Sequence, residues 1–406
     1  MTTRIFVLFL ALMGTQMLLA QDYWVQRDTV NGPPKSAASS FVIDNRAYVV
    51  AGTDEFEYKR KMYSYRADQN DWDDEISLGG DGGDGLARVG ATSFSLTQNG
   101  QTKGYIALGQ TQTIAFMNDL WEYDRNTDAW TQKANFTGAP RREAVSFVIN
   151  NRAYVGTGNS ASGLKKDFYT YDPSTNAWEQ ISDFEGTARR AAVAFSMEAY
   201  GFLGTGDDGT LRHDFWMYNP QSDQWIQKAN FPGGARSGAC GWADFPVCYL
   251  GTGEDADHVF HNDLWEYNYY LNNWTQRADL PGPGRKNAIA FYLDGWGYIG
   301  TGYNDGVFLD DLWAYSGTAA IANQEVPVLR IFPNPTSDFI SIQESAEVLN
   351  YEIVNSKGQT VLTTLQKAGP NSIIDVRDLP SGTYFLRFQV GERVQSATFV
   401  KCNGTL

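Results

Sequence analysis

One basic residue recurs near the start of each of six similar segments, and these residues are the first candidates for binding chemistry. Each lies six residues before a large aromatic residue. Arginine can hold a carboxylate through two parallel hydrogen bonds, and lysine can hold it as a point charge. If the six segments surround one channel, a basic ring at its mouth suits the hydroxyl and carboxylate groups of an acidic sugar. The six residues are Lys35, Arg88, Arg141, Arg189, Arg236 and Arg285.

The same repetition supports a second interpretation. A position that recurs in every copy of a repeat usually serves the repeated fold rather than one ligand. The basic side chains would then pair with neighbouring carboxylates and carbonyl groups and brace the start of each segment. We favour this structural role and keep ligand binding at the channel mouth as the alternative.

Acidic and amide side chains gather in three loops that are predicted to emerge on the same face as the basic residues. Such groups could bind sugar hydroxyls, or they could ligate calcium, which prefers several oxygen atoms. None of the loops has the full ligand pattern of an EF-hand, so we favour solvated charge over a calcium site. The candidates are Asp207, Asp208, Glu254, Asp255, His258, Asn304 and Asp305.

Two cysteines stand in the two strands of one predicted hairpin. Cys240 and Cys248 are eight residues apart. An exported protein can form disulfides. A cross-strand disulfide is therefore the preferred interpretation, and two buried thiols are the alternative. Cys402 is left over.

The spacing of tryptophans reveals the elements that must position these side chains. Five tryptophans recur at spacings of 58, 48, 47 and 49 residues, and an aromatic residue stands nine positions before each. Four of these aromatic residues follow an Asp-Leu or Asp-Phe pair, and Gly-Thr-Gly lies upstream in the later copies. The tryptophans are Trp72, Trp130, Trp178, Trp225 and Trp274.

Each copy contains four short strand patterns joined by turns, such as the hairpin turn at Asn150-Asn151. One four-stranded sheet cannot bury both of its faces, so neighbouring copies must stack. The sixth copy lacks its final tryptophan, and Trp24-Val25-Gln26 matches the missing strand. We therefore predict that the N-terminal strand completes the last sheet and closes a six-membered ring.

These motifs resemble kelch repeats over residues 21–316, and their form is similar to that of secreted kelch proteins of Bacteroidetes-type bacteria. The resemblance implies an all-β chain built as a six-bladed kelch β-propeller. It also implies two enzymatic alternatives to a binding module. The first is an activity like that of the sialic acid epimerases, which would use an arginine and a glutamate or histidine at the channel mouth.

The second alternative is a copper oxidase similar to galactose oxidase. That chemistry needs two histidines, a tyrosine ligand and a Tyr–Cys cofactor. The chain has three histidines, His213, His258 and His261, and Cys240 is the one cysteine near such a face. No motif selects these residues, so we predict neither catalytic residues nor a cofactor.

The two ends of the chain carry a different signal. Residues 1–20 have the pattern of a cleaved signal peptide, and residues 317–326 read as a linker. Residues 327–406 show short strands and regular turns, typical of a small Ig-like β-sandwich. They closely resemble the type A C-terminal sorting domain of the type IX secretion system, which carries its passenger across the outer membrane. The motif residues are Pro333, Asn334, Pro335, Gly358, Gly382, Tyr384 and Lys401.

The composition of the chain limits the classes of partner that it can bind. The net charge of −15 argues against nucleic acid and anionic membranes. No segment after the signal peptide is apolar enough to span a bilayer. We therefore predict a protein that passes through the periplasm and is then secreted or held on the outer-membrane surface. It would bind a glycan or protein there, with the secretion machinery as the partner of its C-terminal domain.

Overall fold

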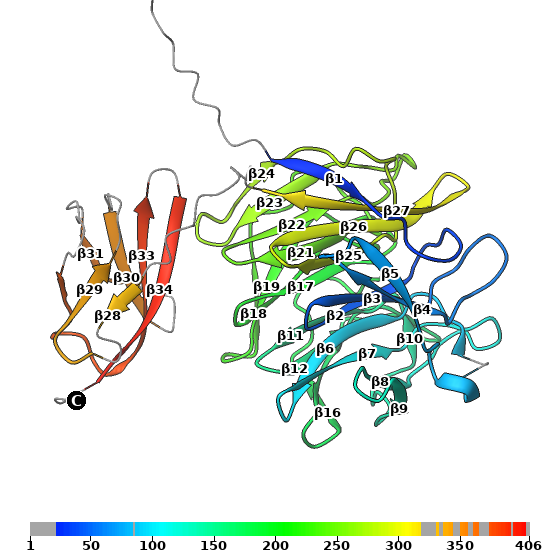
Figure 1. The fold of residues 1–406 in the computed structure, drawn as a ribbon, viewed down its shortest axis with the longest axis horizontal. Helices are drawn as coiled ribbons and strands as arrows, with labels where there is room; N and C mark the ends of the chain where they lie inside the picture. Colours follow the sequence, from blue (N-terminus) through cyan, green and yellow to red (C-terminus); the bar gives the residue numbers. More distant parts are fainter. Residues whose placement is uncertain are drawn as a thin grey trace, which may run out of the picture. The chain divides into compact units, whose positions relative to one another are not determined.

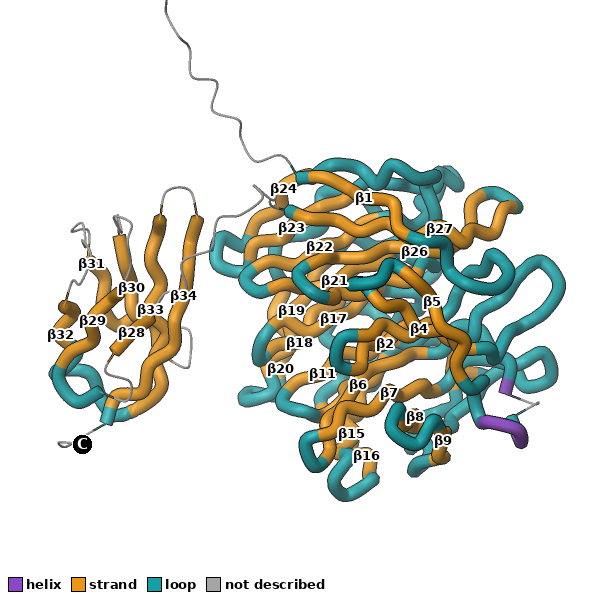
Figure 2. Tube along the Cα trace, viewed as in Figure 1, coloured by secondary structure: helices purple, strands orange, loops and turns teal. Residues whose placement is uncertain are grey.

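Six four-stranded antiparallel sheets form the larger part of the chain, and each is one blade of a propeller (Figure 1). The computed structural model describes residues 22–83, 86–317, 330–332, 336–343, 350–355, 360–364, 373–390 and 393–402. The chain divides into two compact units, residues 1–320 and 321–406. Strands and loops dominate the described residues, and η1 (Gly80–Gly82) is the one helix assigned among them (Figure 2).

The blades follow one another in chain order. The first comprises β2 (Ser39–Ile43), β3 (Arg46–Val50), β4 (Met62–Arg66) and β5 (Asp71–Glu75), and the second β6 (Thr92–Gln98), β7 (Gln101–Ala107), β8 (Leu120–Asp124) and β9 (Ala129–Gln132). The third comprises β11 (Val145–Ile149), β12 (Arg152–Gly156), β15 (Phe168–Asp172) and β16 (Ala177–Ile181), and the fourth β17 (Val193–Met197), β18 (Tyr200–Gly204), β19 (Phe215–Asn219) and β20 (Gln224–Gln227). The fifth comprises β21 (Cys240–Asp244), β22 (Val247–Gly251), β23 (Leu264–Asn268) and β24 (Asn273–Gln276).

A separate small sheet in the third repeat contains β10 (Arg141–Arg142), β13 (Asn159–Ser160) and β14 (Gly163–Leu164).

The sixth blade joins the two ends of the propeller. It comprises β25 (Ile289–Leu293), β26 (Trp296–Asn304), β27 (Val307–Ser316) and the N-terminal strand β1 (Tyr23–Arg27). β1 runs antiparallel to β27, with Trp24 opposite Tyr315. The N-terminal strand therefore occupies the position that the match to Trp24-Val25-Gln26 predicts. Because the last sheet contains strands from both ends of the unit, the ring closes without a free sheet edge at this junction.

In five of the six blades the recurring tryptophan joins the outer strand to the linker that enters the blade, and Trp225 is the exception, since its Nε1–H has no hydrogen-bond partner. The indole Nε1–H of Trp178 donates to the carbonyl oxygen of Ala134 at 2.9 Å, and that of Trp274 donates to Ala229 at 2.9 Å. Trp24 makes the equivalent bond to Ala278 at 2.8 Å, although it lies 254 residues away in the sequence. This shared hydrogen bond gives the tryptophan period a physical cause.

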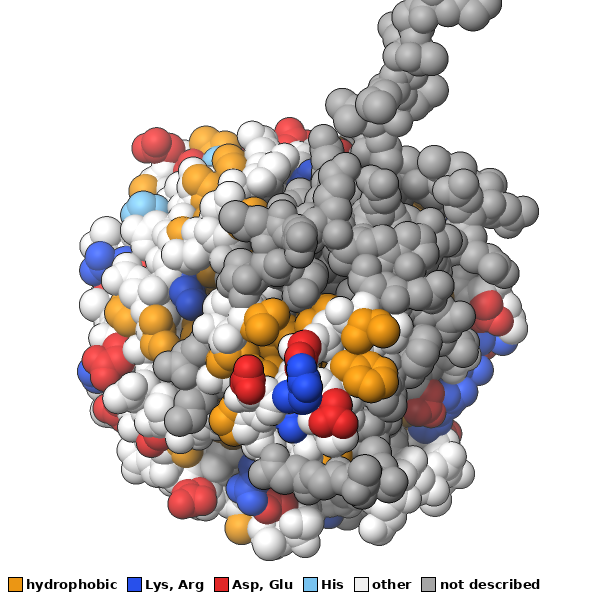
Figure 3. Space-filling view, turned by 90° about the vertical axis from the view of Figure 1, so that its left-hand side faces the viewer, with side chains coloured by type: hydrophobic (Ala, Val, Ile, Leu, Met, Phe, Trp, Pro, Cys, Tyr) orange, Lys and Arg blue, Asp and Glu red, His pale blue; other side chains and the backbone are white. Residues whose placement is uncertain are grey.

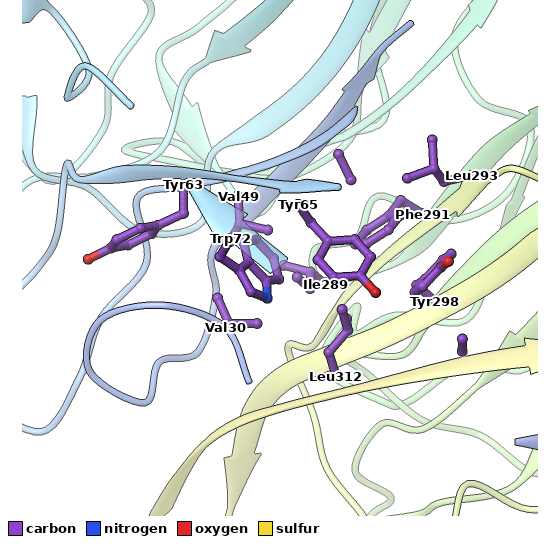
Figure 4. Packing of buried hydrophobic residues seen from close by; sticks show 12 residues of the cluster. Val30, Val49, Tyr63, Tyr65, Trp72, Ile289, Phe291, Leu293, Tyr298 and Leu312 are labelled. Atoms are coloured by element: carbon purple, nitrogen blue, oxygen red, sulfur yellow. The ribbon is translucent and has the colours of Figure 1, made fainter. Parts of the chain in front are cut away.

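The hydrophobic core lies between neighbouring blades. At the junction of the first and sixth blades, Tyr65 and Trp72 pack against Phe291 and Tyr298 (Figure 4). The rings of Tyr65 and Tyr298 meet edge to face, with centroids 5.7 Å apart. Burial of each such side chain contributes about 1.5–3 kcal/mol, so the stacked blades stabilise one another.

A close backbone approach explains one of the strand glycines. Gly297 in β26 lies directly against Trp242 of the fifth blade. A Cβ atom at this position would come within 1.9 Å of the indole ring. The absence of a side chain therefore lets the sixth blade approach the fifth.

The C-terminal unit consists of two small sheets. One contains β28 (Arg330–Phe332), β29 (Phe339–Gln343) and β32 (Ile373–Asp375), and the other contains β31 (Thr360–Thr364), β30 (Asn350–Asn355), β33 (Gly382–Val390) and β34 (Arg393–Lys401). Ile340 and Ile374 of the first sheet share a buried cluster with Ile353, Leu386 and Phe399 of the second. The two sheets therefore enclose a common core, as expected of a β-sandwich.

The preferred prediction of a disulfide is wrong. Cys240 lies opposite Gly251 and Cys248 opposite Ala243, and all three cysteines are free. Alternate residues of a strand point to opposite faces, so the two thiols enter different inter-blade clusters. Burial raises the pKa of Cys240 to about 11 and raises that of Cys248 well above its usual value. Two buried thiols, the alternative interpretation, are what the fold contains.

The second glycine of the Gly-Thr-Gly motif allows a test of how closely the main chain packs at the start of a blade. Gly206 has a φ of 99° and Gly209 a φ of 98°. A Cβ atom on Gly206 would lie 2.9 Å from the carbonyl oxygen of Arg190, whereas one on Gly209 would meet nothing within 4 Å. We expect Gly209→Ala to lower the free energy of unfolding by about 1 kcal/mol and Gly206→Ala by about 3 kcal/mol. Urea denaturation measures both values, and equal losses would contradict the close approach.

Candidate functional site

The recurring basic residues are enclosed within the blades. The side chains of Arg88, Arg141, Arg189, Arg236 and Arg285 are fully buried. In the fourth blade, Nη1 and Nη2 of Arg189 donate to the two carboxylate oxygens of Asp214 at 2.5 and 2.8 Å. Nη1 also donates to the carbonyl oxygen of Thr205 at 2.9 Å. The corresponding aspartates of the other four blades are Asp119, Asp167, Asp263 and Asp311.

Further contacts lock each of these ion pairs. Burial by itself would favour a neutral Asp214, but the hydrogen bonds and charge of Arg189 outweigh it and lower the pKa of that carboxyl. The indole of Trp216 donates a third hydrogen bond to the same carboxylate at 2.8 Å. The ring of Phe184 lies 5.0 Å from the guanidinium carbon of Arg189. The Asp-Phe-Trp motif thus supplies the acid and one of its donors.

The main chain of the same arginine is held by the preceding blade. The carbonyl oxygen of Arg189 accepts a hydrogen bond from Gly158 N–H at 2.7 Å, and its own N–H donates to Lys165 at 3.1 Å. Both partners belong to the third blade. Equivalent bonds reach the carbonyl groups of all six basic residues, including Gly302 N–H to Lys35 at 2.8 Å. Each basic residue therefore joins two adjacent blades.

These contacts correct the prediction of a basic ring that binds a ligand. Lys35 and the five arginines do not present their charged groups at the channel mouth, because those groups point into the blades. The five guanidinium groups are paired with aspartates of the same fold. The observed contacts are those of the bracing role, in which the basic residues pair with carboxylates and carbonyl groups.

Lys35 is the exception, and it has no aspartate partner. The first blade has Lys61 where the other blades have the aspartate. Nζ of Lys35 donates to the carbonyl oxygen of Asn31 at 3.0 Å and lies 4.3 Å from the centre of the Tyr63 ring. Burial is the main cause that lowers the pKa of Lys35 to about 8, and the nearby charge of Lys59 adds to the effect. The first blade therefore lacks both the aspartate and the arginine of the repeated ion pair.

The axis of the propeller contains a cavity of about 390 Å³. Its wall is made by the second and third residues after each buried basic residue, and the third is alanine in all six blades. The second has a positive φ in every blade, between 50° and 65°. Main-chain hydrogen bonds join these residues from blade to blade, as from Ala191 N–H to Glu143 at 3.1 Å. Five of the six junctions in this described region carry such a bond.

Polar side chains enter the axial cavity from the second and third blades. Gln110 donates through Nε2 to the hydroxyl of Tyr58 at 2.6 Å, and its buried Oε1 has no hydrogen-bond partner. The Nε–H of Arg142 is also buried without a partner. Arg142 forms no ion pair with any described residue, and its guanidinium carbon lies 5.9 Å from the centre of the Phe116 ring. The cavity therefore offers one uncompensated positive charge and one free acceptor.

A second arginine beside the cavity is neutralised by its neighbours. Arg190 lies 3.4 Å from Glu143 and 3.0 Å from Asp207. Asp207 also accepts a hydrogen bond from Gly209 N–H at 2.9 Å. Both oxygens of Asp207 are therefore used within the protein. This predicted ligand-binding residue lies near the cavity, and it serves to hold Arg190.

The remaining predicted residues lie in loops where most carboxylates already have partners. Asp208 pairs with Arg212 at 2.6 Å. His258 lies 2.8 Å from Glu254, which Lys286 also contacts, and His261 lies 2.9 Å from Asp255. The amide of Asn304 donates to the carbonyl of Gly284, and Asp305 occupies the turn between β26 and β27. These loops do not place the seven predicted residues around one ligand.

Burial and pairing act in opposite directions on these loop carboxylates. Burial alone would raise the pKa of Glu254, but hydrogen bonds from Lys286 and His258 outweigh it and lower that pKa. Hydrogen bonds from Val259 and His261 likewise outweigh burial and lower the pKa of Asp255. Within the described parts of the chain, no group of three or more His, Cys, Asp and Glu side chains could hold a metal ion.

The residues that line the cavity were missed because they break the repeat. Three of the six copies have neutral residues at the first and second positions after the buried basic residue, whereas the third blade has Arg142-Glu143. A comparison of the six copies for unusual residues at these two positions would have selected Arg142 and Glu143, together with Arg190 and Lys286.

The sorting motif is described in part. Gly382 begins β33, and the hydroxyl of the buried Tyr384 donates to the carbonyl oxygen of Pro380 at 2.8 Å. Lys401 ends β34, and its side chain is buried. Pro333, Asn334, Pro335 and Gly358 lie outside the described residues, as do the predicted signal peptide and most of the predicted linker.

The surface charge is mixed. On the face shown in Figure 3, acidic and basic side chains of the described residues are interspersed. The excess of acidic residues is therefore not gathered into one patch on that face. Among the described residues, no helix is long and apolar enough to cross a membrane.

Comparison with known proteins agrees with this architecture. Residues 38–243, about half of the chain, match the family described as KLHDC2/KLHL20/DRC7 Kelch-repeats domain. Residues 330–401 match the secretion system C-terminal sorting domain. None of the curated proteins matches the chain. A solved structure titled "Structure of YjhT" has the same fold, with a TM-score of 0.58 and 14% identity over 70% of this chain and 96% of the other.

Because Lys35 is buried without an aspartate partner, we predict that the free energy of unfolding depends on pH in the alkaline range. Below pH 8 it is protonated in both the folded and unfolded chain, and the fold bears the full cost of the buried charge. Between about pH 8 and the ordinary value of 10.5 the folded chain releases the proton first, so the free energy of unfolding rises with pH. We expect Lys35→Met to abolish this rise, which is worth about 3 kcal/mol in full.

Urea denaturation of both proteins from pH 7 to 10 measures the difference. The stability of Lys35→Met relative to the native chain should fall across this range, because only the native chain gains. Burial also raises the pKa of tyrosines such as Tyr63 and Tyr65. This effect is common to both proteins and cancels in the difference. Parallel pH profiles would contradict a buried, unpaired lysine.

Proposed function

Because the chain belongs to the kelch-repeat family and carries the C-terminal sorting domain of a secretion system, we propose that it is an exported binding module. The propeller is the part that binds, and the C-terminal unit directs transport through the type IX system. The protein would act after passage through the periplasm, either secreted or attached to the outer-membrane surface. The binding site is the axial cavity with the loops around its mouth.

The uncompensated charge of Arg142 carries this proposal. Arg142 is half-buried, its Nε–H is buried without a hydrogen-bond partner, and no carboxylate of the described residues pairs with its guanidinium group. An anionic ligand would accept from that donor and balance the charge. The free Oε1 of Gln110 in the same cavity requires a hydrogen-bond donor. A ligand that presents a carboxylate close to an N–H or O–H group satisfies both residues.

The rim of the cavity favours a protein segment as the source of that carboxylate. Loops between the second and third strands of four blades present exposed apolar side chains, namely Phe56, Ile114, Val259 and Val307. These loops share one face of the propeller because the strands of every blade alternate in direction. Apolar tips around a charged centre are suited to a peptide that inserts an acidic residue and covers the rim.

Replacement of Arg142 tests the proposed centre. The probe is an array of short peptides and glycans, each with and without a carboxylate, applied to the full chain. We expect the native protein to bind acidic peptides and Arg142→Ala to lose at least tenfold in affinity, because the ligand's charge is left unpaired. Arg152→Ala is the control, since Arg152 forms an exposed ion pair with Asp172 away from the cavity.

The two arms of the array separate the possible sources of the carboxylate. Binding of acidic glycans alone, with the same dependence on Arg142, would keep the site and replace the protein segment by a sugar. Equal affinities of Arg142→Ala and the native chain would contradict the axial site.

Export is tested by truncation. Removal of residues 327–406 deletes the sorting unit and leaves the propeller strands intact. We expect the truncated protein to accumulate in the periplasm, as measured by cell fractionation and by protease access to intact cells. Normal delivery of the truncated chain to the surface or medium would contradict the transport role.

A further inference from the structure

A groove away from the axis is a further cavity in the described part of the propeller. It has a volume of about 400 Å³, which suits one or two sugar rings. Its walls come from the linker that enters the fourth blade and from the residues around the start of β19. We call it the blade-4 groove, and it is lined by Glu185, Gly186, Thr187, Arg212, His213, Asp214, Trp216 and Asn230.

Trp216 provides a rigid apolar wall in this groove. Its Nε1–H is bound to Asp214 at 2.8 Å, and Phe184 packs on it edge to face with centroids 5.6 Å apart. Asp214 is in turn held by the buried Arg189. The indole therefore keeps its orientation without a ligand. When a ligand stacks on it, the side chain loses little conformational entropy, so the free-energy cost of binding is small.

The polar groups beside Trp216 are mainly acceptors. Glu185 is exposed and forms no hydrogen bond or ion pair with another described residue. The Nδ1–H of His213 donates to the carbonyl oxygen of Phe231 at 3.2 Å. An imidazole whose Nδ1 carries the proton presents Nε2 as an acceptor. An aromatic wall flanked by a carboxylate and an imidazole acceptor matches a ring with one apolar face and several hydroxyl donors.

The charge of the groove favours a neutral ligand over an acidic one. Arg212 is held by Asp208 at 2.6 Å, and Asp214 is held by Arg189. Glu185 is therefore the one unpaired charge among the side chains that line the groove, and it is negative. A carboxylate-bearing sugar would be repelled here, whereas a neutral sugar would not.

Glu185 is also specific to this linker. The linkers that enter the fifth and sixth blades have Pro232 and Pro281 at the equivalent position, seven residues after the blade tryptophan. The fold therefore does not require a carboxylate there. Trp216, in contrast, recurs as Trp265 in the fifth blade with the same bond to its aspartate, at 2.9 Å.

We propose that the blade-4 groove binds a neutral pyranose residue, with the sugar ring stacked on Trp216 and its hydroxyl groups donating to Glu185 and His213. This site is separate from the axial cavity and does not depend on the ligand bound there. It gives the protein a second specificity, for neutral carbohydrate.

The test measures binding of the full chain to immobilised neutral hexose disaccharides and their methyl glycosides. We expect the native chain to bind members of this neutral set, Glu185→Gln to lose at least tenfold in affinity, and Trp216→Ala to lose binding. Trp265→Ala is the matched control, because it removes the same repeated tryptophan and the same hydrogen bond outside the groove. Arg142→Ala should bind neutral sugars as the native chain does.

Three results would overturn the proposal. The first is a native chain that binds no neutral sugar. The second is equal binding by Glu185→Gln and the native chain together with equal losses in Trp216→Ala and Trp265→Ala, which would reduce Trp216 to a structural residue. The third is loss of neutral-sugar binding in Arg142→Ala, which would place the sugar in the axial cavity.

Discussion

The buried arginine at the start of five of the six blades makes the interaction on which the propeller depends. Its guanidinium group is bound by an aspartate and a carbonyl group of its own blade, while its main chain is bound by the preceding blade. A buried ion pair by itself is weak evidence of stability, because desolvation offsets the attraction. Here the arginine of the pair also donates to a carbonyl group of its own blade, and its main chain is bonded to the preceding blade. The loss of either partner would leave a buried charge and loosen an inter-blade junction.

This arrangement separates the residues of the fold from those that remain for ligands. Contacts within and between blades already occupy the residues that repeat, namely the Arg, Asp, Gly-Thr-Gly and Trp positions. Residues that depart from the repeat are different, because the contacts repeated in every blade do not use their side chains. Glu143 faces the axis where the other five blades have Ala, Gly or Asn, and Arg142 lines the axial cavity beside it. Glu185 stands where the linkers that enter the fifth and sixth blades have proline. In this propeller, departures from the repeat indicate function better than the repeat does.

The first blade shows how the same interaction adapts to substitution. Lys61 replaces the aspartate, and Lys35 replaces the arginine. Lys35 keeps the main-chain bond to Gly302 N–H, so the link between the sixth and first blades survives. Its ammonium group is left with a carbonyl group and the Tyr63 ring in place of a carboxylate. The basic residue without an aspartate partner therefore stands at the junction of the sixth and first blades, where β1 also joins the two ends of the unit.

The sequence by itself determined the fold class, the six blades and the closing strand, because each rests on spacings that recur along the chain. It also limited the recurring basic residues to two roles. Only the tertiary structure decided between those roles, because the aspartate that pairs with Arg141 lies 26 residues away, and because Arg141 and Arg142 are chemically alike but point in opposite directions. Strand alternation likewise separated Cys240 from Cys248. The axial cavity was beyond reach because it is formed by residues of all six blades, whose proximity depends on closure of the ring. The blade-4 groove was beyond reach because Glu185, Trp216 and Asn230 are brought together by the folding of one blade and its linkers.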